Sequence, residues 1–286
     1  MSTCKEFQAE NLLSPYPPKA ARLIVTIYGD VVEPRGGVLW MGNLISLCAG
    51  FGINESLVRT AVSRLVSRGQ LSGQREGRRS FYALTDAARA EYHAAAESFY
   101  GELDGECDWI ITHCSEQSSQ TVLLRHGYVS LGGDVFAGAD RPDRPLRGTA
   151  FRAVSIGDET QDLADLLQSV FNMEALSADY SDFVRAFRPM RNLAETKPDG
   201  QSALLLRLAL VHAYRDIRLR DPRFPPSVLP DNWTGCDAHR LFADLYSTLS
   251  EQADTYIGRH LLNRRGLLEE RPEAVLSRLN SLADRL

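Results

Sequence analysis

The sequence predicts a mostly helical α+β protein, and three observations support that class. Apolar residues recur with helical spacing over residues 19–68 and again from residue 159 onward. Between these regions the spacing gives way to two short apolar runs, Trp109–Thr112 and Thr149–Ile156, which are typical of strands. A chain of 286 residues is also long enough for two or three domains.

Three helices are expected near the N-terminus, over residues 19–28, 41–49 and 55–68. The third has the clearest ends. Asn54 is a favourable N-cap, and Gly69 stands where a glycine commonly stops a helix. The short Gly-Phe-Gly turn before it places the second and third helices in a helix-turn-helix arrangement.

The third helix is amphipathic. A rotation of about 100° per residue places its aliphatic side chains on one face. These side chains are Leu57, Val58, Ala61, Val62, Leu65 and Val66. We expect Leu57, Val62 and Leu65 to lie in the core.

The opposite face of this helix has the composition expected of a DNA-recognition helix. A helix that enters the major groove needs an apolar face held by its domain and short polar or guanidinium groups on the other. The candidate DNA-binding residues on this helix are Asn54, Ser56, Arg59, Thr60, Ser63 and Arg64. Arg59 in particular could donate two hydrogen bonds to a guanine.

A hairpin is expected after Gly69, from strands 71–75 and 78–84. Arg75, Arg78 and Arg79 surround its turn and complete a candidate winged helix-turn-helix over residues 1–86, where they would contact phosphate. Residues 1–85 carry a net charge of +4 and the remainder −9, and residues 56–82 hold six arginines against one glutamate. The basic end is the expected contact with nucleic acid.

The remaining chain divides into three predicted segments: a linker helix over 87–107, a central α+β domain over 108–192 and a helical domain over 193–286. The later helices are expected at 159–172, 178–192, 201–219, 237–262 and 272–285.

Several classes of protein are disfavoured. No apolar stretch is long enough to span a bilayer and no secretory signal is evident, so a cytoplasmic location is expected. Five scattered cysteines without a Cys-x-x-Cys pair argue against disulfides and structural zinc, and the Cys107, His113 and Cys114 group lacks a fourth ligand. No catalytic motif stands in a supporting context, so we expect neither an enzyme nor a bound metal or cofactor.

Two separated segments resemble the PaaX-type repressors of phenylacetic acid degradation operons. The first is Gly52–Val66 followed by Gly69, the expected recognition segment. The second, in the same order as in the family, comprises His212-Ala-Tyr-Arg, Asp221-Pro, Leu229-Pro, Trp233-Thr-Gly and Leu241–Tyr246.

This resemblance implies a winged-helix N-terminus, a central domain similar to the ferredoxin-like fold of the small CRISPR adaptation protein, and a helical C-terminal domain. It further implies a homodimer that binds a palindromic operator in double-stranded DNA. The implied function is repression of a phenylacetate-type catabolic operon, with release by an aryl-acyl-CoA. The segment Ser115–Gly127 departs from the family, because it is shorter and less basic than the family's corresponding helix is expected to be. The effector is therefore expected to be phenylacetyl-CoA, another acyl-CoA or an aromatic acid.

Candidate effector contacts are Arg188, His212 and Arg215, because a CoA thioester needs cations near an apolar slot. Each has an ordinary alternative: arginines spaced by three commonly form a solvated face, and a histidine that ends an apolar run is commonly a packing residue. The alternative function is a nucleic-acid-binding protein without sequence preference, or a protein-interaction scaffold, built around the ferredoxin-like domain.

Overall fold

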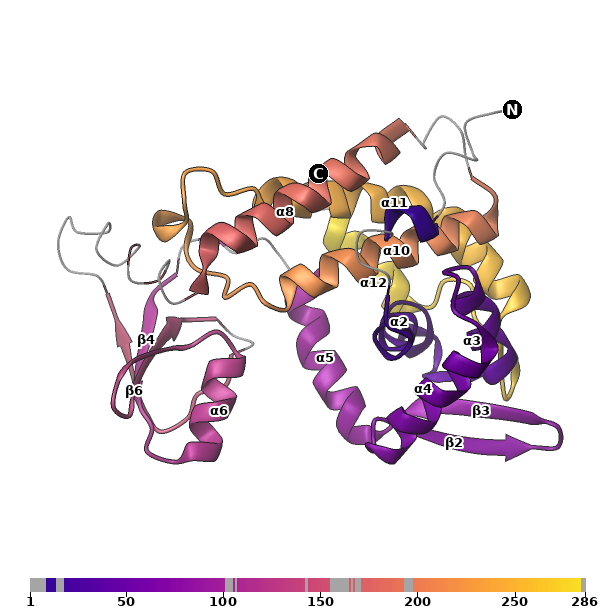
Figure 1. Ribbon diagram of the computed structural model, residues 1–286, viewed down its shortest axis with the longest axis horizontal. Helices are drawn as coiled ribbons and strands as arrows, with labels where there is room; N and C mark the ends of the chain where they lie inside the picture. Colours follow the sequence, from indigo (N-terminus) through magenta and orange to yellow (C-terminus); the bar gives the residue numbers. More distant parts are fainter. Residues whose placement is uncertain are drawn as a thin grey trace. The chain divides into compact units, whose positions relative to one another are not determined.

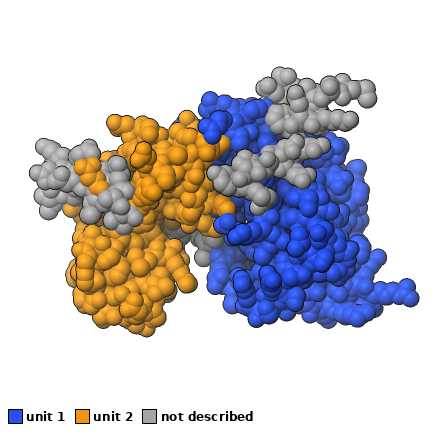
Figure 2. Space-filling model, in the orientation of Figure 1, with its two compact units in different colours: residues 1–101, 183–215, 240–286 blue, residues 102–182, 216–239 orange. Residues whose placement is uncertain are grey.

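The computed structural model has an α+β fold dominated by helices, as the sequence predicts (Figure 1). The structure describes residues 9–13, 18–100, 105, 107–141, 144–154, 165, 167, 171–192 and 198–283. Two compact units are present (Figure 2). Unit 1 combines residues 1–101 with 183–215 and 240–286, and unit 2 combines residues 102–182 with 216–239. The C-terminal helices therefore share a unit with the N-terminal segment.

The N-terminal part of unit 1 contains a three-stranded antiparallel sheet of order β1-β3-β2, in which Leu39 pairs with Tyr82 and Tyr82 with Gly73. Its elements are α1 (Ala9–Leu12), α2 (Ala20–Ile27), the π-helical turn η2 (Tyr28–Val32), the 3-10 turn η3 (Glu33–Arg35), β1 (Val38–Trp40), α3 (Met41–Ala49), α4 (Glu55–Ser67), β2 (Leu71–Glu76), β3 (Arg79–Leu84) and α5 (Asp86–Tyr100).

Both predicted ends of α4 are confirmed. Asn54 Oδ1 accepts a hydrogen bond of 3.0 Å from the Leu57 N–H, which satisfies one of the free donors of the first turn. Gly69 adopts a φ of +68°, the left-handed conformation that ends a helix without the steric cost of a side chain.

The predicted core face of α4 is correct except at its margins. Val62 and Leu65 are buried, but Leu57 is 55% exposed and Val66 39% exposed. The buried set of α4 is Val58, Ala61, Val62 and Leu65. At 100° per residue, Leu57 and Val66 lie about 90° to either side of the centre of that set, so neither reaches the core. The prediction that Leu57 is a core residue was wrong.

The C-terminal part of unit 1 contributes helices and one small hairpin, β8 (Leu262–Asn263) with β9 (Gly266–Leu267). The helices are α8 (Met173–Phe187), the 3-10 turn η4 (Arg188–Asn192), α10 (Gly200–Arg218), α11 (Gly235–His260) and α12 (Glu273–Ala283). Of α8, α10 and α11, residues 183–187, 200–215 and 240–260 belong to unit 1. Aromatic rings join them to α5: Phe242 stacks on Tyr214 at 4.4 Å and meets Phe99 edge-on at 5.2 Å.

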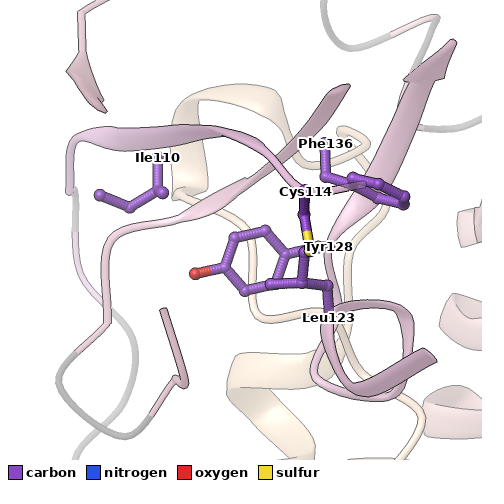
Figure 3. Close-up of a cluster of buried hydrophobic side chains, with 5 residues drawn as sticks. All are labelled: Ile110, Cys114, Leu123, Tyr128 and Phe136. Atoms are coloured by element: carbon purple, nitrogen blue, oxygen red, sulfur yellow. The ribbon is translucent and has the colours of Figure 1, made fainter. Parts of the chain in front are cut away.

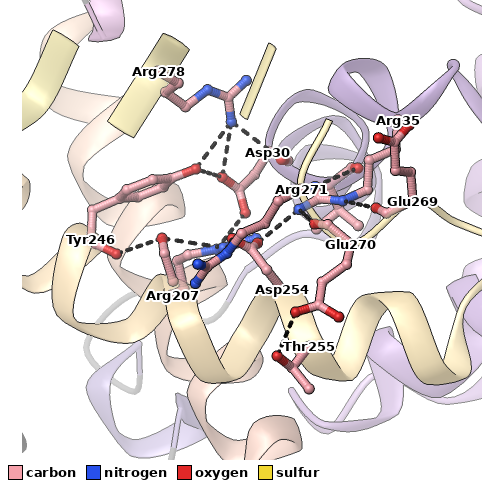
Figure 4. A network of polar contacts seen from close by, with 12 residues as sticks. Asp30, Arg35, Arg207, Tyr246, Asp254, Thr255, Glu269, Glu270, Arg271 and Arg278 are labelled. Carbon is pink, nitrogen blue, oxygen red and sulfur yellow. Dashed lines mark hydrogen bonds and ion pairs between the residues drawn. The ribbon is translucent and has the colours of Figure 1, made fainter. Parts of the chain in front are cut away.

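A buried network of charges connects η2 to α10, α11 and α12 inside unit 1 (Figure 4). Asp30 pairs with Arg207 at 3.0 Å and with Arg278 at 3.3 Å, and it accepts a 2.8 Å bond from the Tyr246 hydroxyl. Burial raises the pKa of Asp30, but the two arginines and the hydroxyl outweigh it and hold this pKa below its ordinary value of 3.8.

A second carboxylate, Asp254, completes the network. It accepts 2.7 Å bonds from both Arg35 and Arg207, and all three side chains are buried. Since one buried carboxylate left without its cations would be strongly destabilising, these contacts fix the N-terminal segment to the C-terminal helices.

Unit 2 contains a four-stranded antiparallel sheet of order β5-β6-β4-β7. Its elements are β4 (Trp109–His113), α6 (Gln117–Arg125), β5 (Val129–Gly132), β6 (Val135–Ala139), β7 (Thr149–Ala153) and the 3-10 turn η5 (Pro226–Val228). Side chains from the sheet and α6 form a buried cluster (Figure 3), whose members are Ile110, Cys114, Leu123, Tyr128 and Phe136. Cys114 is therefore a packing residue.

Several predicted boundaries need correction. The helix expected over 178–192 begins at Met173, after Asn172 caps the Ala175 N–H, and its α-helical part ends at Phe187 because Pro189 cannot continue it. The helix expected to reach residue 262 ends at His260, where the β8 strand follows. The helix expected over 159–172 lies almost entirely outside the described residues.

Candidate nucleic-acid interface

Helix α4 presents its polar face on the surface of unit 1. The turn between α3 and α4 is tight because Gly52 adopts a φ of +72°, and Ile53 N–H returns to the Cys48 carbonyl at 3.2 Å. The apolar face of α4 packs against α2, α3 and β2. The surrounding core therefore fixes which side chains of α4 face outward.

All six candidate residues on α4 are exposed: Asn54, Ser56, Arg59, Thr60, Ser63 and Arg64. Two of them already bond to the helix itself, since Asn54 caps its first turn and the Thr60 hydroxyl donates to the Ser56 carbonyl at 2.9 Å. Asn54 thus has a structural role in addition to any contact with DNA.

Arg59 is held by an exposed ion pair. Its Nη2 lies 2.6 Å from Glu55 Oε1, and the two side chains are 59% and 58% exposed. Surface pairs of this kind contribute about 0.2–1 kcal/mol. The guanidinium can therefore exchange Glu55 for another acceptor at little cost.

The predicted hairpin is present as β2 and β3, with Gly77 at its tip in the left-handed region at φ +58°. Arg75 Nε donates to the Gly77 carbonyl at 3.1 Å, Arg78 is exposed at the tip, and the Arg79 guanidinium lies 5.2 Å from the Trp40 ring centroid. All three arginines surround the turn, as the sequence predicts.

A concave pocket with a volume of about 380 Å³ lies between α4 and the hairpin. Arg59 and Ser63 line it from α4, and Arg75 and Tyr82 line it from β2 and β3. The structure thus brings together residues of the two segments that the sequence assigned separately to base and phosphate contacts.

A contact that the sequence did not predict joins the hairpin to the C-terminal β8–β9 turn. The Arg264 guanidinium donates to the Gln74 side chain and lies 3.7 Å from Glu76 Oε1. Asn43 of α3 holds the preceding segment, because its amide donates to the His260 carbonyl at 3.0 Å and accepts from the Leu262 N–H at 2.8 Å. A turn signal at Asn263–Gly266 was visible in the sequence, but its partner was not.

The three candidate effector residues occupy different environments within unit 1. Arg188 is exposed on η4, Arg215 is half-buried on α10, and His212 is buried with a ring nitrogen 2.9 Å from the Thr26 hydroxyl. His212 therefore packs α10 against α2, which agrees with the packing alternative stated for it.

Membrane spans and metal sites are both absent from the part of the chain that the structure describes. None of its helices there combines the length and apolar character needed to cross a membrane. No group of three or more His, Cys, Asp or Glu side chains among the described residues is arranged to hold a metal ion.

Comparison with known proteins gives matches at both ends of the chain. The family model described as "PaaX-like protein" matches residues 19–88, and the model described as "PaaX-like protein C-terminal domain" matches residues 171–259. The chain is 27% identical over 272 residues to the Transcriptional repressor PaaX of Escherichia coli strain K12, with 87% of this chain and 86% of that protein covered. Two matches in family order, spanning the α3–α4 segment and the C-terminal helices, show that the chain belongs to the PaaX-like family.

Proposed function

We propose that the protein is a sequence-specific, DNA-binding transcriptional repressor of a phenylacetate-type catabolic operon. The observation that carries this proposal is the exposed polar face of α4 beside an arginine-bearing hairpin, with Arg59 and Arg75 lining one concave pocket. The similarity to a protein named as a transcriptional repressor supports the same function.

In this proposal α2, α3, α4 and the hairpin β2–β3 act as a winged helix-turn-helix. Helix α4 enters the major groove, where Arg59, Ser63 and Thr60 contact base edges, and Asn54, Ser56 and Arg64 contact bases or backbone near the same groove. The hairpin is the wing. Arg75, Arg78 and Arg79 contact phosphates, which adds affinity and little sequence preference.

The charge of this surface suits DNA. Residues 56–82 carry six arginines and one glutamate in a chain whose overall net charge is −5. A basic surface attracts the phosphate backbone, while an acidic remainder limits binding elsewhere on the molecule.

We assign the sheet of unit 2 to a ferredoxin-like domain. Its chain order β4, α6, β5, β6, β7 and its antiparallel spatial order β5-β6-β4-β7 match the four strands and the first helix of the β-α-β-β-α-β pattern of that fold. The second helix of the pattern would fall between β6 and β7, and the described residues of that connection form no helix.

The effector is phenylacetyl-CoA or a related acyl-CoA that releases a homodimer from a palindromic operator. The phosphates of CoA require arginine donors. Arg188, which is exposed, and Arg215, which is half-buried, are the candidate donors, and the buried His212 links α10 to α2 through the Thr26 hydroxyl. Since α2 also packs on α4, a ligand that displaced α10 would disturb the DNA-reading elements.

The test is a gel-shift titration of the protein on its own upstream DNA at fixed salt, with and without phenylacetyl-CoA and with free CoA as the control. The proposal predicts specific binding that only the thioester abolishes. Specific DNA binding that phenylacetyl-CoA does not change would still support a repressor but would reject this effector. Equal affinity for upstream and shuffled DNA would instead support the alternative of a nucleic-acid-binding scaffold without sequence preference.

A further inference from the structure

The β8–β9 turn has a defined shape. Asn263 Oδ1 accepts the Arg265 N–H at 2.7 Å, and Gly266 closes the turn with a φ of +130°. Leu268 N–H returns to the Leu261 carbonyl at 2.9 Å, which closes the hairpin at its base. Two adjacent arginines, Arg264 and Arg265, therefore stand at the tip of an ordered hairpin.

This turn is attached to the α3–α4 segment at two places. Asn43 of α3 bonds to the chain on either side of Leu261, and Arg264 bonds to Gln74 and pairs with Glu76 on β2. All of these residues belong to unit 1. The turn and the hairpin β2–β3 consequently form one continuous surface.

Positive charges outnumber negative charges on that surface. Glu76 is the sole acidic residue between Leu71 and Leu84, and Arg264 pairs with it. Arg265 is exposed, and its side chain has no ion pair or hydrogen bond with any residue that the structure describes. The pairing of Arg264 thus neutralises the one negative charge of the hairpin that carries Arg75, Arg78 and Arg79, while Arg265 keeps its full charge on the attached turn.

We propose that Arg265 is a further phosphate contact of the DNA-binding surface, supplied by the C-terminal part of the chain and positioned by Arg264. The proposal rests on the function proposed above and extends the DNA-binding surface beyond the winged segment. Hydrogen bonds fix the backbone of the turn, so the backbone loses little conformational freedom on binding, and the planar guanidinium of Arg265 matches the geometry of a phosphate.

The experiment measures the salt dependence of DNA binding by fluorescence anisotropy for the wild type, Arg265→Ala and Arg265→Lys on upstream DNA. Each phosphate contact contributes about 0.9 to the slope of log affinity against log salt. Arg265→Ala should therefore bind more weakly at low salt, and its deficit should shrink about 3.5-fold between 50 and 200 mM for each phosphate that Arg265 neutralises. Arg265→Lys should keep the wild-type slope because it keeps the charge.

The matched control is Arg125→Ala, which removes an exposed arginine from the last turn of α6 in unit 2 and should leave the slope unchanged. Equal slopes for the wild type and Arg265→Ala would overturn the phosphate contact and leave the repressor function intact. A wild type that binds upstream and shuffled DNA equally would overturn the repressor function instead. The slopes measured on shuffled DNA would then still decide whether Arg265 contacts phosphate.

Discussion

Replacing Asp30 with alanine removes the carboxylate on which the buried charge network converges. In the wild type this carboxylate accepts bonds from Arg207 Nε at 3.0 Å, Arg278 Nη1 at 3.3 Å and the Tyr246 hydroxyl at 2.8 Å. After the substitution Arg207 keeps Asp254 as a partner, whereas the acceptors that Arg278 keeps among the described residues are uncharged, such as the Gly29 carbonyl and the Tyr92 hydroxyl.

The expected loss of stability follows from these bonds. The two buried bonds that Arg207 and Arg278 donate to Asp30, at about 1.5–3 kcal/mol each, give a loss of about 3–6 kcal/mol in the free energy of unfolding. Removal of one partner from a buried ion pair independently gives about 3–5 kcal/mol. Asp30→Asn should lose less, about 1.5–3 kcal/mol, because the amide oxygen still accepts from Tyr246 while its NH₂ group faces Arg207.

The assay is urea denaturation followed by far-ultraviolet circular dichroism at pH 7, with the free energy of unfolding extrapolated to water. The matched control is Glu251→Ala, which removes an exposed carboxylate from the same α11 helix that carries Asp254. The control should change the free energy by less than about 0.5 kcal/mol. An Asp30→Ala variant no less stable than Glu251→Ala would show that this network does not hold unit 1 together.

Three further predictions concern pH and α4. Because the folded pKa of Asp30 lies below its ordinary value of 3.8, the stabilisation by this carboxylate should be complete above pH 3.8 and diminish as the pH falls below it. The difference in unfolding free energy between the wild type and Asp30→Asn should therefore narrow from pH 5 to pH 3. A constant difference would contradict this. In the same denaturation assay, Leu57→Ala should lower the free energy of unfolding by less than about 0.5 kcal/mol and Leu65→Ala by about 2–5 kcal/mol. Equal losses in the two variants would contradict the observed exposure of Leu57. Asn54→Ala should destabilise the protein by about 1 kcal/mol and Asn54→Gly by only a few tenths, whereas no loss in either variant would show that the cap is dispensable.

Local sequence signals predicted the elements that depend on local interactions. The bounds of α3 and the caps of α4 follow from neighbouring residues, such as Asn54 and Gly69, whose effects extend over a single turn. The outward position of Arg59 and Ser63 also followed from the helical period. Leu57 was misplaced because a helical wheel gives the direction of a side chain but not the width of the buried surface that receives it.

The contacts between distant segments could not be predicted in the same way. Asp30 and Arg207 are 177 positions apart, and Arg264 and Gln74 are 190 apart. No periodicity or capping pattern relates such residues, since only the folded chain decides which charges are neighbours. The addition of C-terminal segments to unit 1 was missed for this reason, and so was the β8–β9 turn beside the hairpin.

Whether α4 reads DNA sequence is decided by the affinities of the wild type and Arg59→Ala for upstream DNA and for shuffled DNA of equal length at one salt concentration. We expect the wild type to bind upstream DNA at least about 10³-fold more tightly than shuffled DNA. We also expect Arg59→Ala to lose about 1–3 kcal/mol per half-site on upstream DNA while its affinity for shuffled DNA changes little. Equal wild-type affinities for the two DNAs would contradict a sequence-reading role for α4.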